Sequence, residues 1–461
     1  MKFALYFGNR GFMPAELIEG AREDMVKAVT DAGYEYLIMD KDATRYGAVE
    51  TRDEGRLYAK WLKSHEGEYD GVILCMPIFV DENGAIAALQ DAGVPILMQA
   101  YPDEIGKMDF QHRRDAYCGK FSVTDVFEQY KVPYTVMKPH VVHPLTPEFT
   151  KNLHDFAAIC RVVKGMKRFT IGCIGARTTA FKTVRIDEIA MQSHGVNVET
   201  IDLSMVFDMM DKVEENELKS KMEHVAKVAD FGNYPPEKLE NLSRFAVTVD
   251  KLIEMYNLQA VAIRCWDELE KKYNIAPCVI LSDLNERGIP AACELDVNNA
   301  IMMYALQCAS QHPVMLLDLN NNYGEDKTKS IMFHCSAIPG SFFCGGTCIS
   351  EHLMFKKTYG EGTGVGIVNG KVKSCDVTIG SFKTEDGELW SFSTEGKLTD
   401  DAFDKEFFGC GIVYESPKMP DVLRYMFENG YRHHVAITPG SWSEAVEEAF
   451  EIYLDYNCDI I

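Results

Sequence analysis

The first hundred residues alternate between short apolar runs and a stretch with helical spacing, and this alternation constrains the fold more than any other feature. Apolar runs that predict strands occupy residues 3–7, 36–39, 71–76 and 94–98. Between the first two runs, residues 17–29 carry apolar side chains at helical spacing, and Gly33 follows as a typical helix stop. Strands that alternate with helices form parallel sheets, so we predict a doubly wound α/β domain over residues 1–166.

A second alternation of the same kind begins at residue 169. The predicted strands cover residues 169–174, 196–203, 260–264, 289–293 and 314–319. The predicted helices cover residues 183–193, 205–231, 236–256 and 297–310. We therefore predict a second doubly wound domain over residues 167–350.

The last hundred residues change from helical spacing to a period of two. Residues 365–368 and 371–382 flank the dipeptide Asn369-Gly370, which is typical of a tight hairpin turn. Residues 388–394 and 411–415 predict further strands. The expected fold class is α/β, with two doubly wound parallel-sheet domains followed by a smaller β-rich C-terminal domain over residues 351–461.

The charge and composition exclude several classes of protein. The 461 residues carry 70 Asp and Glu against 47 Lys and Arg, a formal net charge of −23, which argues against nucleic acid or an anionic membrane as partner. The start of the chain lacks the pattern of a signal peptide, and no apolar stretch is long enough to span a membrane. Several of the 14 cysteines lie within apolar runs, which suits a reducing compartment. We therefore expect a cytoplasmic protein.

Three polar residues follow three consecutive apolar runs, namely Glu294, Asp318 and His334. If these runs are neighbouring strands of a parallel sheet, their carboxyl ends form one edge, where α/β sheets build their sites. Asp296 is placed to cap the helix from residue 297, which leaves Glu294 free for another role. Two carboxylates with one or two imidazoles suit Mn²⁺ or Mg²⁺ and can transfer protons. A second source of imidazole is His433-His434, of which a strand would point only one toward a given site.

Two other motifs have simpler interpretations. The glycine-rich residues 360–366 resemble a nucleotide loop, but they open no helix and contain Glu361, and no P-loop lysine motif is present, which argues against a dehydrogenase or a kinase. Arg177 and Arg185 lie with two acids at the turn after the strand 169–174. This cluster is either a surface ion-pair network of little energetic weight or part of a site.

Taken in order, these pieces resemble the L-fucose isomerase and L-arabinose isomerase superfamily, and most closely its fucose isomerase branch. The resembling residues run from 175 to 434 and comprise Gly175-Ala-Arg177, Phe181, Val184-Arg185, Glu188, Cys265-Trp266, Pro277-Cys278, Ala292-Cys293-Glu294-Leu295-Asp296, Leu317-Asp318, Phe333-His334-Cys335 and His433-His434. The chain is shorter than a typical fucose isomerase, so the loops around the sugar differ.

The resemblance implies a site and an assembly. Glu294 and Asp318 would be both metal ligands and catalytic proton-transfer groups, with His434 or His433 as the third ligand of Mn²⁺, and Mg²⁺ or Co²⁺ as alternative ions. His334 would contact the substrate or the metal, and Arg177, Arg185 and Trp266 would bind the substrate. The family architecture also implies a homo-oligomer, a trimer or a hexamer, with sites near the subunit interfaces.

The function that the resemblance implies is metal-dependent aldose–ketose isomerisation of an open-chain sugar through a cis-enediol or enediolate, an intramolecular oxidoreductase reaction. An alternative is isomerisation of an anionic sugar, sulfonated or carboxylated, for which Arg177, Arg185 or Lys120 would supply positive charge. A third alternative is an intracellular sugar-binding protein without turnover. The substrate in each case is a small sugar.

Overall fold

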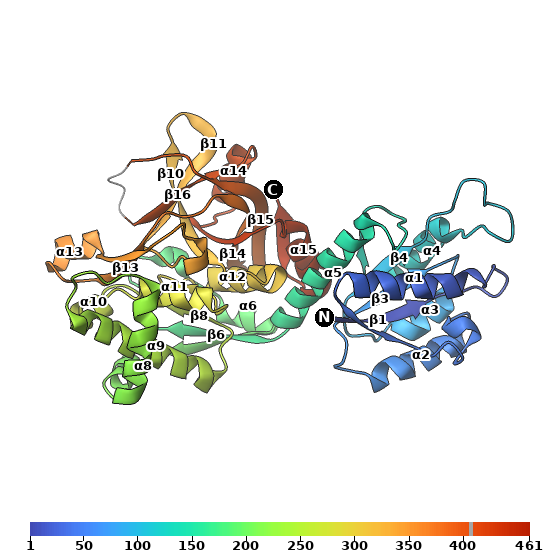
Figure 1. Cartoon of the computed structure of the whole chain (residues 1–461), viewed down its shortest axis with the longest axis horizontal. Coiled ribbons are helices and arrows are strands. Elements are labelled where there is room, and N and C mark those ends of the chain that lie inside the picture. Colours follow the sequence, from blue (N-terminus) through green and yellow to red (C-terminus); the bar gives the residue numbers. More distant parts are fainter. Residues whose placement is uncertain (405–408) are drawn as a thin grey trace. The chain divides into compact units, whose positions relative to one another are not determined.

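The structure is a computed structural model that describes residues 1–404 and 409–461, and the chain forms two compact units (Figure 1). One unit contains residues 1–164 and 448–454, and the other contains residues 165–447 and 455–461. The domain boundaries predicted after residues 166 and 350 stay predictions, because compactness alone does not define where a chain folds independently. In the described part of the chain, no helix is long and apolar enough to cross a membrane.

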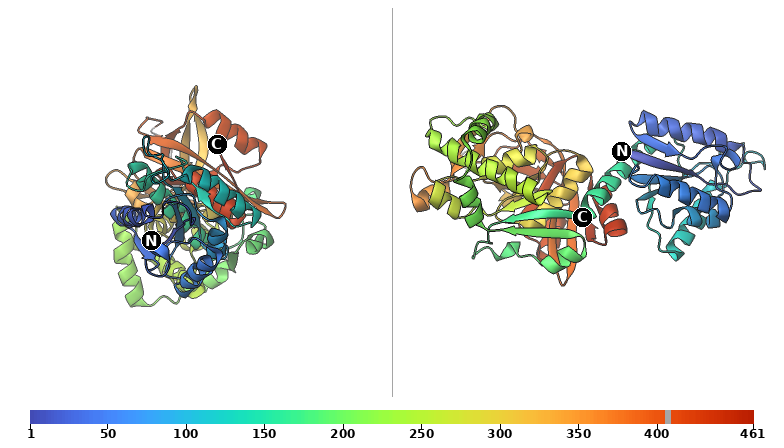
Figure 2. Two further views of the ribbon diagram at one scale, coloured as in Figure 1. Left: turned by 90° about the vertical axis from the view of Figure 1, so that its right-hand side faces the viewer. Right: turned by 90° about the horizontal axis from the view of Figure 1, so that it is seen from below.

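The first unit is a doubly wound parallel sheet with the strand order β2-β1-β3-β4-β5. Its strands are β1 (Lys2–Phe7), β2 (Glu35–Ile38), β3 (Gly71–Met76), β4 (Ile96–Ala100) and β5 (Thr135–Val136). Its helices are α1 (Leu17–Asp31), α2 (Arg52–Ser64), α3 (Glu82–Leu89), α4 (Ala116–Gln129) and α5 (Pro147–Met166), with a 3₁₀ turn at Arg45–Gly47. Separate apolar cores form on the two faces of the sheet, one with α1 and α5 and the other with α2, α3 and α4 (Figure 2). The predicted fold class is confirmed for this unit.

The second unit begins with a four-stranded parallel sheet in the order β7-β6-β8-β9. Its strands are β6 (Phe169–Ile174), β7 (Val196–Ile201), β8 (Ala260–Ile263) and β9 (Ala291–Ala292). The helices of this part are α6 (Glu188–Ser193), α7 (Leu203–Met210), α8 (Glu215–Val228), α9 (Pro236–Tyr256), α10 (Glu268–Tyr273), α11 (Cys278–Glu286) and α12 (Val297–Ser310), with a 3₁₀ turn at Lys182–Val184.

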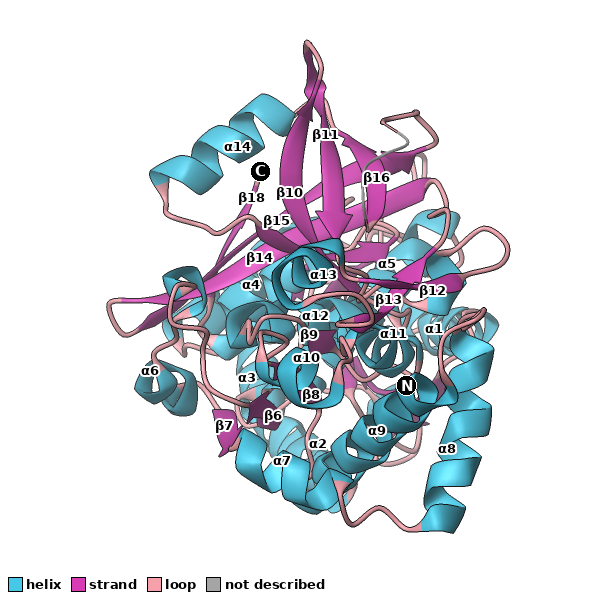
Figure 3. Ribbon diagram, turned by 90° about the vertical axis from the view of Figure 1, so that its left-hand side faces the viewer, coloured by secondary structure: helices cyan, strands magenta, loops and turns pink. Residues whose placement is uncertain are grey.

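A larger mixed sheet completes the second unit, in the order β14-β17-β10-β11-β16-β15-β18. Because β14 also pairs with β15, the strands close on themselves, and β18 is added in parallel to β15 (Figure 3). The strands are β10 (Met315–Tyr323), β11 (Asp326–His334), β14 (Cys375–Glu385), β15 (Glu388–Thr399), β16 (Cys410–Glu415), β17 (His434–Pro439) and β18 (Asn457–Ile460). The remaining elements are the paired strands β12 (Cys348–Glu351) and β13 (Val365–Asn369), a 3₁₀ turn at Gly340–Phe342, the helices α13 (Leu353–Tyr359), α14 (Met419–Glu428) and α15 (Ser443–Glu448), and a π-helix at Ala449–Leu454.

Helix α12 joins the two sheets, since it contacts β6, β8 and β9 of the parallel sheet and β10, β14 and β17 of the mixed sheet. Its residues are buried almost all round, as expected for a helix that lies inside a core. Close packing around β14 favours a glycine, because a Cβ at Gly380 would lie 2.7 Å from the carbonyl oxygen of Phe392 and 2.3 Å from the terminal methyl of Met302. The N-terminus of α12 is thereby fixed at the junction of the two sheets.

The strands near residues 314–334 differ from the sequence prediction. We predicted consecutive strands of a parallel sheet, but β10 and β11 form an antiparallel hairpin of the mixed sheet, with Asp318 opposite Phe333. Apolar runs do not distinguish the two arrangements, because both bury the same side chains. Of the three apolar runs that precede Glu294, Asp318 and His334, only the first, which contains β9, ends at the carboxyl edge of the parallel sheet.

Three other local predictions were wrong. The dipeptide Asn369-Gly370 does not connect a hairpin, because β13 pairs with β12, and β14 pairs with β15 and β17. Neither of its residues adopts the positive φ that the predicted turn requires. The helix predicted over 205–231 is divided into α7 and α8, and the one over 183–193 shortens to α6 behind a 3₁₀ turn.

Candidate active site

The backbone between β9 and α12 places the first site residue, Glu294. Glu294 and Leu295 have φ values of 58° and 63°, in the left-handed region that residues with a Cβ rarely occupy. The amide of Leu295 donates to the carbonyl of Ile263 at 3.2 Å, which ties this turn to the end of β8. Such local strain persists where the surrounding structure enforces it, commonly at functional sites.

The mixed sheet supplies two more residues from neighbouring strands. Asp318 on β10 is the direct cross-strand partner of His434 on β17, so both side chains lie on the same face of the sheet. His434 is fully buried, and its Nε2 lies 3.1 Å from Oε2 of Glu294 and 3.4 Å from Oδ1 of Asp318. His433 precedes the strand, is 43% exposed in its side chain, and places Nε2 4.0 Å from the same Asp318 oxygen.

A buried carboxylate, Asp296, holds the His434 ring from the other side. Its Oδ2 lies 2.8 Å from Nδ1 of His434, and its Oδ1 accepts from Nη1 of Arg432 at 2.7 Å. Asp296 also caps α12, as the sequence predicted, by accepting from the amide of Asn299 at 3.1 Å. Burial opposes ionisation of Asp296, but Arg432 and His434 outweigh that cost and hold its pKa well below the ordinary value.

These contacts leave one atom of His434 facing only acceptors. Nδ1 faces Asp296, and Nε2 faces the oxygens of Glu294 and Asp318, so Nε2 either carries a second proton or, in the neutral ring, offers a lone pair to a cation. Both Nε2 and Oδ1 of Asp318 are buried, and neither has a hydrogen bond to any described residue. Burial lowers the pKa of His434, but its contact with Asp296 and the neighbouring carboxylates of Glu294 and Asp318 raise it to about 10. The site thus requires a positive charge at this position, either a proton or a cation.

The donor set fits a divalent metal ion. The ligand atoms of Glu294, His334 and His434 lie within 4.8 Å of one another, as do those of Asp318, His433 and His434. Carboxylate oxygens with imidazole and no thiolate suit Mn²⁺, Mg²⁺ or Co²⁺. The contact from Asp296 to the far nitrogen of His434 is the arrangement that orients histidine ligands in metal sites.

His334 is held in a form that favours hydrogen-bond donation. It lies at the end of β11, it is buried, and its Nδ1 accepts from the amide of Cys335 at 2.9 Å. Because Nδ1 is an acceptor, the proton of the neutral ring is on Nε2. A protonated Nε2 has no lone pair for a metal, so this tautomer is a hydrogen-bond donor.

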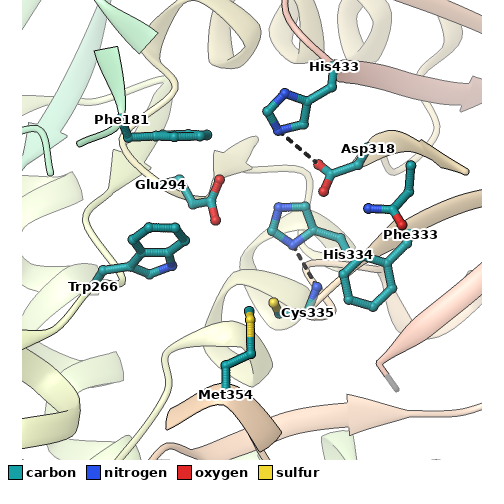
Figure 4. Close-up of a pocket in the computed structure, with 10 residues that line it drawn as sticks. Phe181, Trp266, Glu294, Asp318, Phe333, His334, Cys335, Met354 and His433 are labelled. Atoms are coloured by element: carbon teal, nitrogen blue, oxygen red, sulfur yellow. Dashed lines mark hydrogen bonds and ion pairs between the residues drawn. The ribbon is translucent and has the colours of Figure 1, made fainter. Parts of the chain in front are cut away.

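A cavity of about 410 Å³ opens beside these residues (Figure 4). This volume is within the range of small-molecule sites. Phe181 and Trp266 stand on one side of the cavity, and Asp318, His334 and Phe333 on the other. The full lining is Phe181, Trp266, Glu294, Asp318, Asn320, Phe333, His334, Cys335, Met354 and His433. The cavity therefore combines apolar walls with a small group of acids and imidazoles.

The sequence-predicted residues separate into two groups. Glu294, Asp318, His334, His433 and Trp266 line the cavity, and His434 lies buried behind Glu294 and Asp318. Arg177 and Arg185 are not among the lining residues: Arg177 donates to the carbonyls of Thr178 and Thr179, and Arg185 lines a different pocket.

Sequence reasoning missed part of the site. It gave Asp296 only a capping role, and it assigned no role to Arg432, although Arg432 directly precedes the histidine pair. It also did not place Met354 or Asn320 at the cavity. Strand alternation could have found Asn320, which follows Asp318 by two residues on β10, whereas no spacing rule connects Met354 of α13 to the other site residues.

The fold and the cavity are those of an α/β enzyme that uses acidic and imidazole side chains to act on a small molecule. Residues 4–167 match the family described as fucose/sulfoquinovose isomerase, N-terminal domain, and residues 332–461 match L-fucose isomerase, C-terminal domain. The chain belongs to the fucose isomerase-like superfamily. This confirms the resemblance seen in the sequence and the enzyme class, an aldose–ketose isomerase.

Curated relatives cover most of the chain. The sulfoquinovose isomerases of Priestia aryabhattai and Priestia megaterium are each 26% identical over 394 residues, which are 84% of this chain and 85% of theirs. The sulfoquinovose isomerase of Alkalicoccus urumqiensis is 22% identical over 389 residues, 83% of this chain and 84% of its own. A solved periplasmic solute binding protein from Actinobacillus succinogenes aligns with 68% of this chain and 92% of its own at 10% identity and a TM-score of 0.18, and this match supports no conclusion.

Proposed function

We propose that the chain isomerises an open-chain aldose to the ketose, and that Glu294, Asp318 and His434 hold the divalent cation on which the reaction depends. The observation that carries this proposal is the position of His434 Nε2, which is buried 3.1 Å and 3.4 Å from two carboxylate oxygens and has no hydrogen-bond partner among the described residues. A bound divalent cation would stabilise the negative charge that develops on two neighbouring sugar oxygens.

The proton transfers fall to the carboxylates that line the cavity. Isomerisation removes a proton from C2 of the aldose, returns one to C1, and moves a proton between O1 and O2. Glu294 and Asp318 are suited to these transfers, because both face the cavity. Burial disfavours the anion of Glu294, but the His434 ring 3.1 Å away lowers its pKa, so Glu294 is ionised and able to accept a proton.

The remaining lining residues position the sugar. Nε2 of His334 donates a hydrogen bond to a sugar oxygen, because the amide of Cys335 fixes its tautomer. The rings of Phe181 and Trp266, 5.7 Å apart between centroids, pack against the carbon face of the sugar. His433 completes the opposite wall beside Asp318.

A sulfonated sugar is the second candidate for the substrate. The observation in its favour is that curated relatives over more than four fifths of this chain are named sulfoquinovose isomerases. Against it, the ten described residues that line the cavity include no lysine or arginine. Sulfonate recognition would therefore require a cation from outside this lining.

An assay over neutral aldoses and a sulfonated hexose, with Mn²⁺ and with EDTA, tests the reaction and its metal dependence. We expect turnover of at least one sugar that EDTA abolishes and added Mn²⁺ restores. In D₂O, transfer through an enediol labels the product carbon with deuterium, whereas an unlabelled product would indicate a hydride shift. Absence of turnover together with tight sugar binding would instead support a binding protein.

Two substitutions test the site assignment. Glu294→Gln and Asp318→Asn should each abolish turnover and weaken Mn²⁺ binding in calorimetry. Asp326→Asn is the matched control, because Asp326 is an exposed aspartate at the other end of the β10–β11 hairpin. A double variant at Glu294 and Asp318 that retains activity would remove the assignment.

The homo-oligomer implied by the family resemblance is part of the same proposal. Light scattering coupled to size exclusion measures it directly, and a trimer or a hexamer is the expected result. A monomer with full activity would show that each chain forms a complete site.

A further inference from the structure

A second, polar pocket of about 480 Å³ lies in the same unit and shares no lining residue with the cavity described above. It is formed by the segment 182–187, the end of β14 with the turn that follows it, and the residues before β17. Its charged lining residues are Lys182, Arg185, Lys383 and Arg432, together with the acids Asp187, Glu385 and Asp386.

The four cations differ in how many of their hydrogen-bond donors are engaged. The Arg432 side chain is only 6% exposed, and while Nη1 bonds to Asp296 and to the carbonyl of Phe382, its buried Nε has no partner among the described residues. Lys182 and Arg185 form no side-chain hydrogen bond or ion pair with any described residue. Lys383 differs, because Glu385 and the carbonyl of Asn429 already accept from it.

Two of the three acids in the pocket are already satisfied. Glu385 pairs with Lys383. Asp187 caps α6 by accepting from the amides of Ile189 and Ala190, each at 3.0 Å. Asp386 remains, in the turn between β14 and β15. The lining as a whole holds four cations and three acids, and Lys182 and Arg185 are the cations that no described acid pairs.

We propose that this pocket binds a tetrahedral oxyanion, a sulfate, sulfonate or phosphate group, through Lys182, Arg185 and Arg432. Guanidinium and ammonium groups bind such oxygens through short charge-assisted hydrogen bonds. A chain with a formal net charge of −23 repels anions in general, so a concave group of four cations, two of which have no acidic partner among the described residues, is a local exception that favours their capture.

The pocket is physically linked to the active site at two points. Arg432 and His434 bind the two oxygens of the same carboxylate, Asp296. An anion at Arg432 would compete with Asp296 for the guanidinium, and Asp296 is the group that orients His434. The second link is sequential: Lys182 in the pocket follows Phe181, whose ring lies 5.7 Å from the ring of His434.

Calorimetric titration of the full-length protein with sodium sulfate, against sodium chloride of equal ionic strength, tests the proposal. We expect saturable sulfate binding that weakens by at least about tenfold in a Lys182→Gln/Arg185→Gln double variant, because two charge-assisted contacts are lost. Lys219→Gln/Lys227→Gln removes two exposed lysines of α8 and serves as the charge-matched control that should leave the affinity unchanged. An unchanged Mn²⁺ affinity of the double variant shows that it is folded. No sulfate binding, or binding that the double variant leaves unchanged, overturns the proposal.

A second measurement separates the two sources of the anion. If the group belongs to a sugar, sulfate raises the KM for a hexose with a C6 sulfonate, and the double variant raises that KM but not the KM for the neutral hexose. If the anion is a free effector, sulfate binds in the presence of saturating sugar and changes kcat without competition. Both results support the pocket as an oxyanion site and differ only in what delivers the anion.

Discussion

Asp296→Asn is the most informative single substitution in this chain. The two carboxylate oxygens of Asp296 accept from four donors. Oδ1 accepts from Arg432 Nη1 and from the backbone amide of Asn299, and Oδ2 accepts from His434 Nδ1 and from the side-chain amide of Asn299. The substitution keeps the shape of the side chain but replaces one acceptor with a donor. The remaining carbonyl oxygen should face Arg432, because that guanidinium is always charged.

The amide nitrogen would then face His434, and the ring would move its proton from Nδ1 to Nε2. In that tautomer Nε2 presents hydrogen to Glu294 and Asp318 and offers no lone pair to a metal. Loss of such an orienting contact weakens metal binding by about 10- to 100-fold, or roughly 1.4–2.7 kcal/mol. The fully buried Arg432 also loses its counter-charge, which costs about 3–5 kcal/mol of stability in comparable buried pairs.

Two assays separate these effects. Urea unfolding in EDTA measures the stability of the metal-free protein, and calorimetry with Mn²⁺ measures the affinity. Asp202→Asn is the control, because Asp202 caps α7 from an exposed position without a buried partner, and asparagine is an equally good cap. Wild-type Mn²⁺ affinity in Asp296→Asn, with a loss of stability no larger than in the control, would refute the reasoning.

Three further results are expected. Glu270 is buried with no partner for either carboxylate oxygen among the described residues, and burial raises its pKa from 4.5 to about 8. Its folded form holds a proton that the unfolded form releases, so the free energy of unfolding should fall as pH rises from about 4.5 to 8, by at most about 5 kcal/mol. Glu270→Gln should flatten this slope when urea unfolding is measured at several pH values. Glu237→Gln, at an exposed position, should leave the slope unchanged. Gly366→Ala should lower the free energy of unfolding by at least about 1–3 kcal/mol, because a Cβ there would lie 2.0 Å from the carbonyl of Ala276 and φ is 141°, whereas Gly346→Ala meets no atom within 4 Å and should be nearly neutral. Removal of the metal with EDTA should lower the melting temperature. Mn²⁺ added to about 100 times its Kd should raise the free energy of unfolding again by roughly 2.7 kcal/mol.

The sequence predicted the elements of the fold better than their pairing. Strands and helices with strong periodicity, such as β3, β6, α9 and α12, begin and end where we predicted. The pairing of β10 and β11 could not be predicted, because a run such as residues 314–317 is equally apolar in a parallel or an antiparallel sheet. The hairpin predicted at Asn369-Gly370 was wrong because the strands on either side of it pair with other strands, β12 and β17, instead of with each other.

The candidate site shows the same division. Glu294, Asp318 and the histidine pair stand out in the sequence because each is polar beside an apolar run, and the structure brings them around one cavity although two of the presumed strand ends are not parallel. The double role of Asp296 could not be predicted, because Arg432 and His434 come from 136 and 138 residues further along the chain. The placement of Arg185 in a separate pocket depends on a short 3₁₀ turn that helical periodicity does not reveal.

The cross-strand pairing of Asp318 with His434 links metal affinity to correct assembly of the sheet. A slip of one residue between β10 and β17 would turn either side chain to the opposite face and leave the binding site without one of its proposed ligands. A chain with this error would bury much the same apolar surface and would be hard to distinguish by compactness. Tight Mn²⁺ binding would therefore act as a check on strand register, and newly made chains that have captured the ion would be those in which the two strands are aligned.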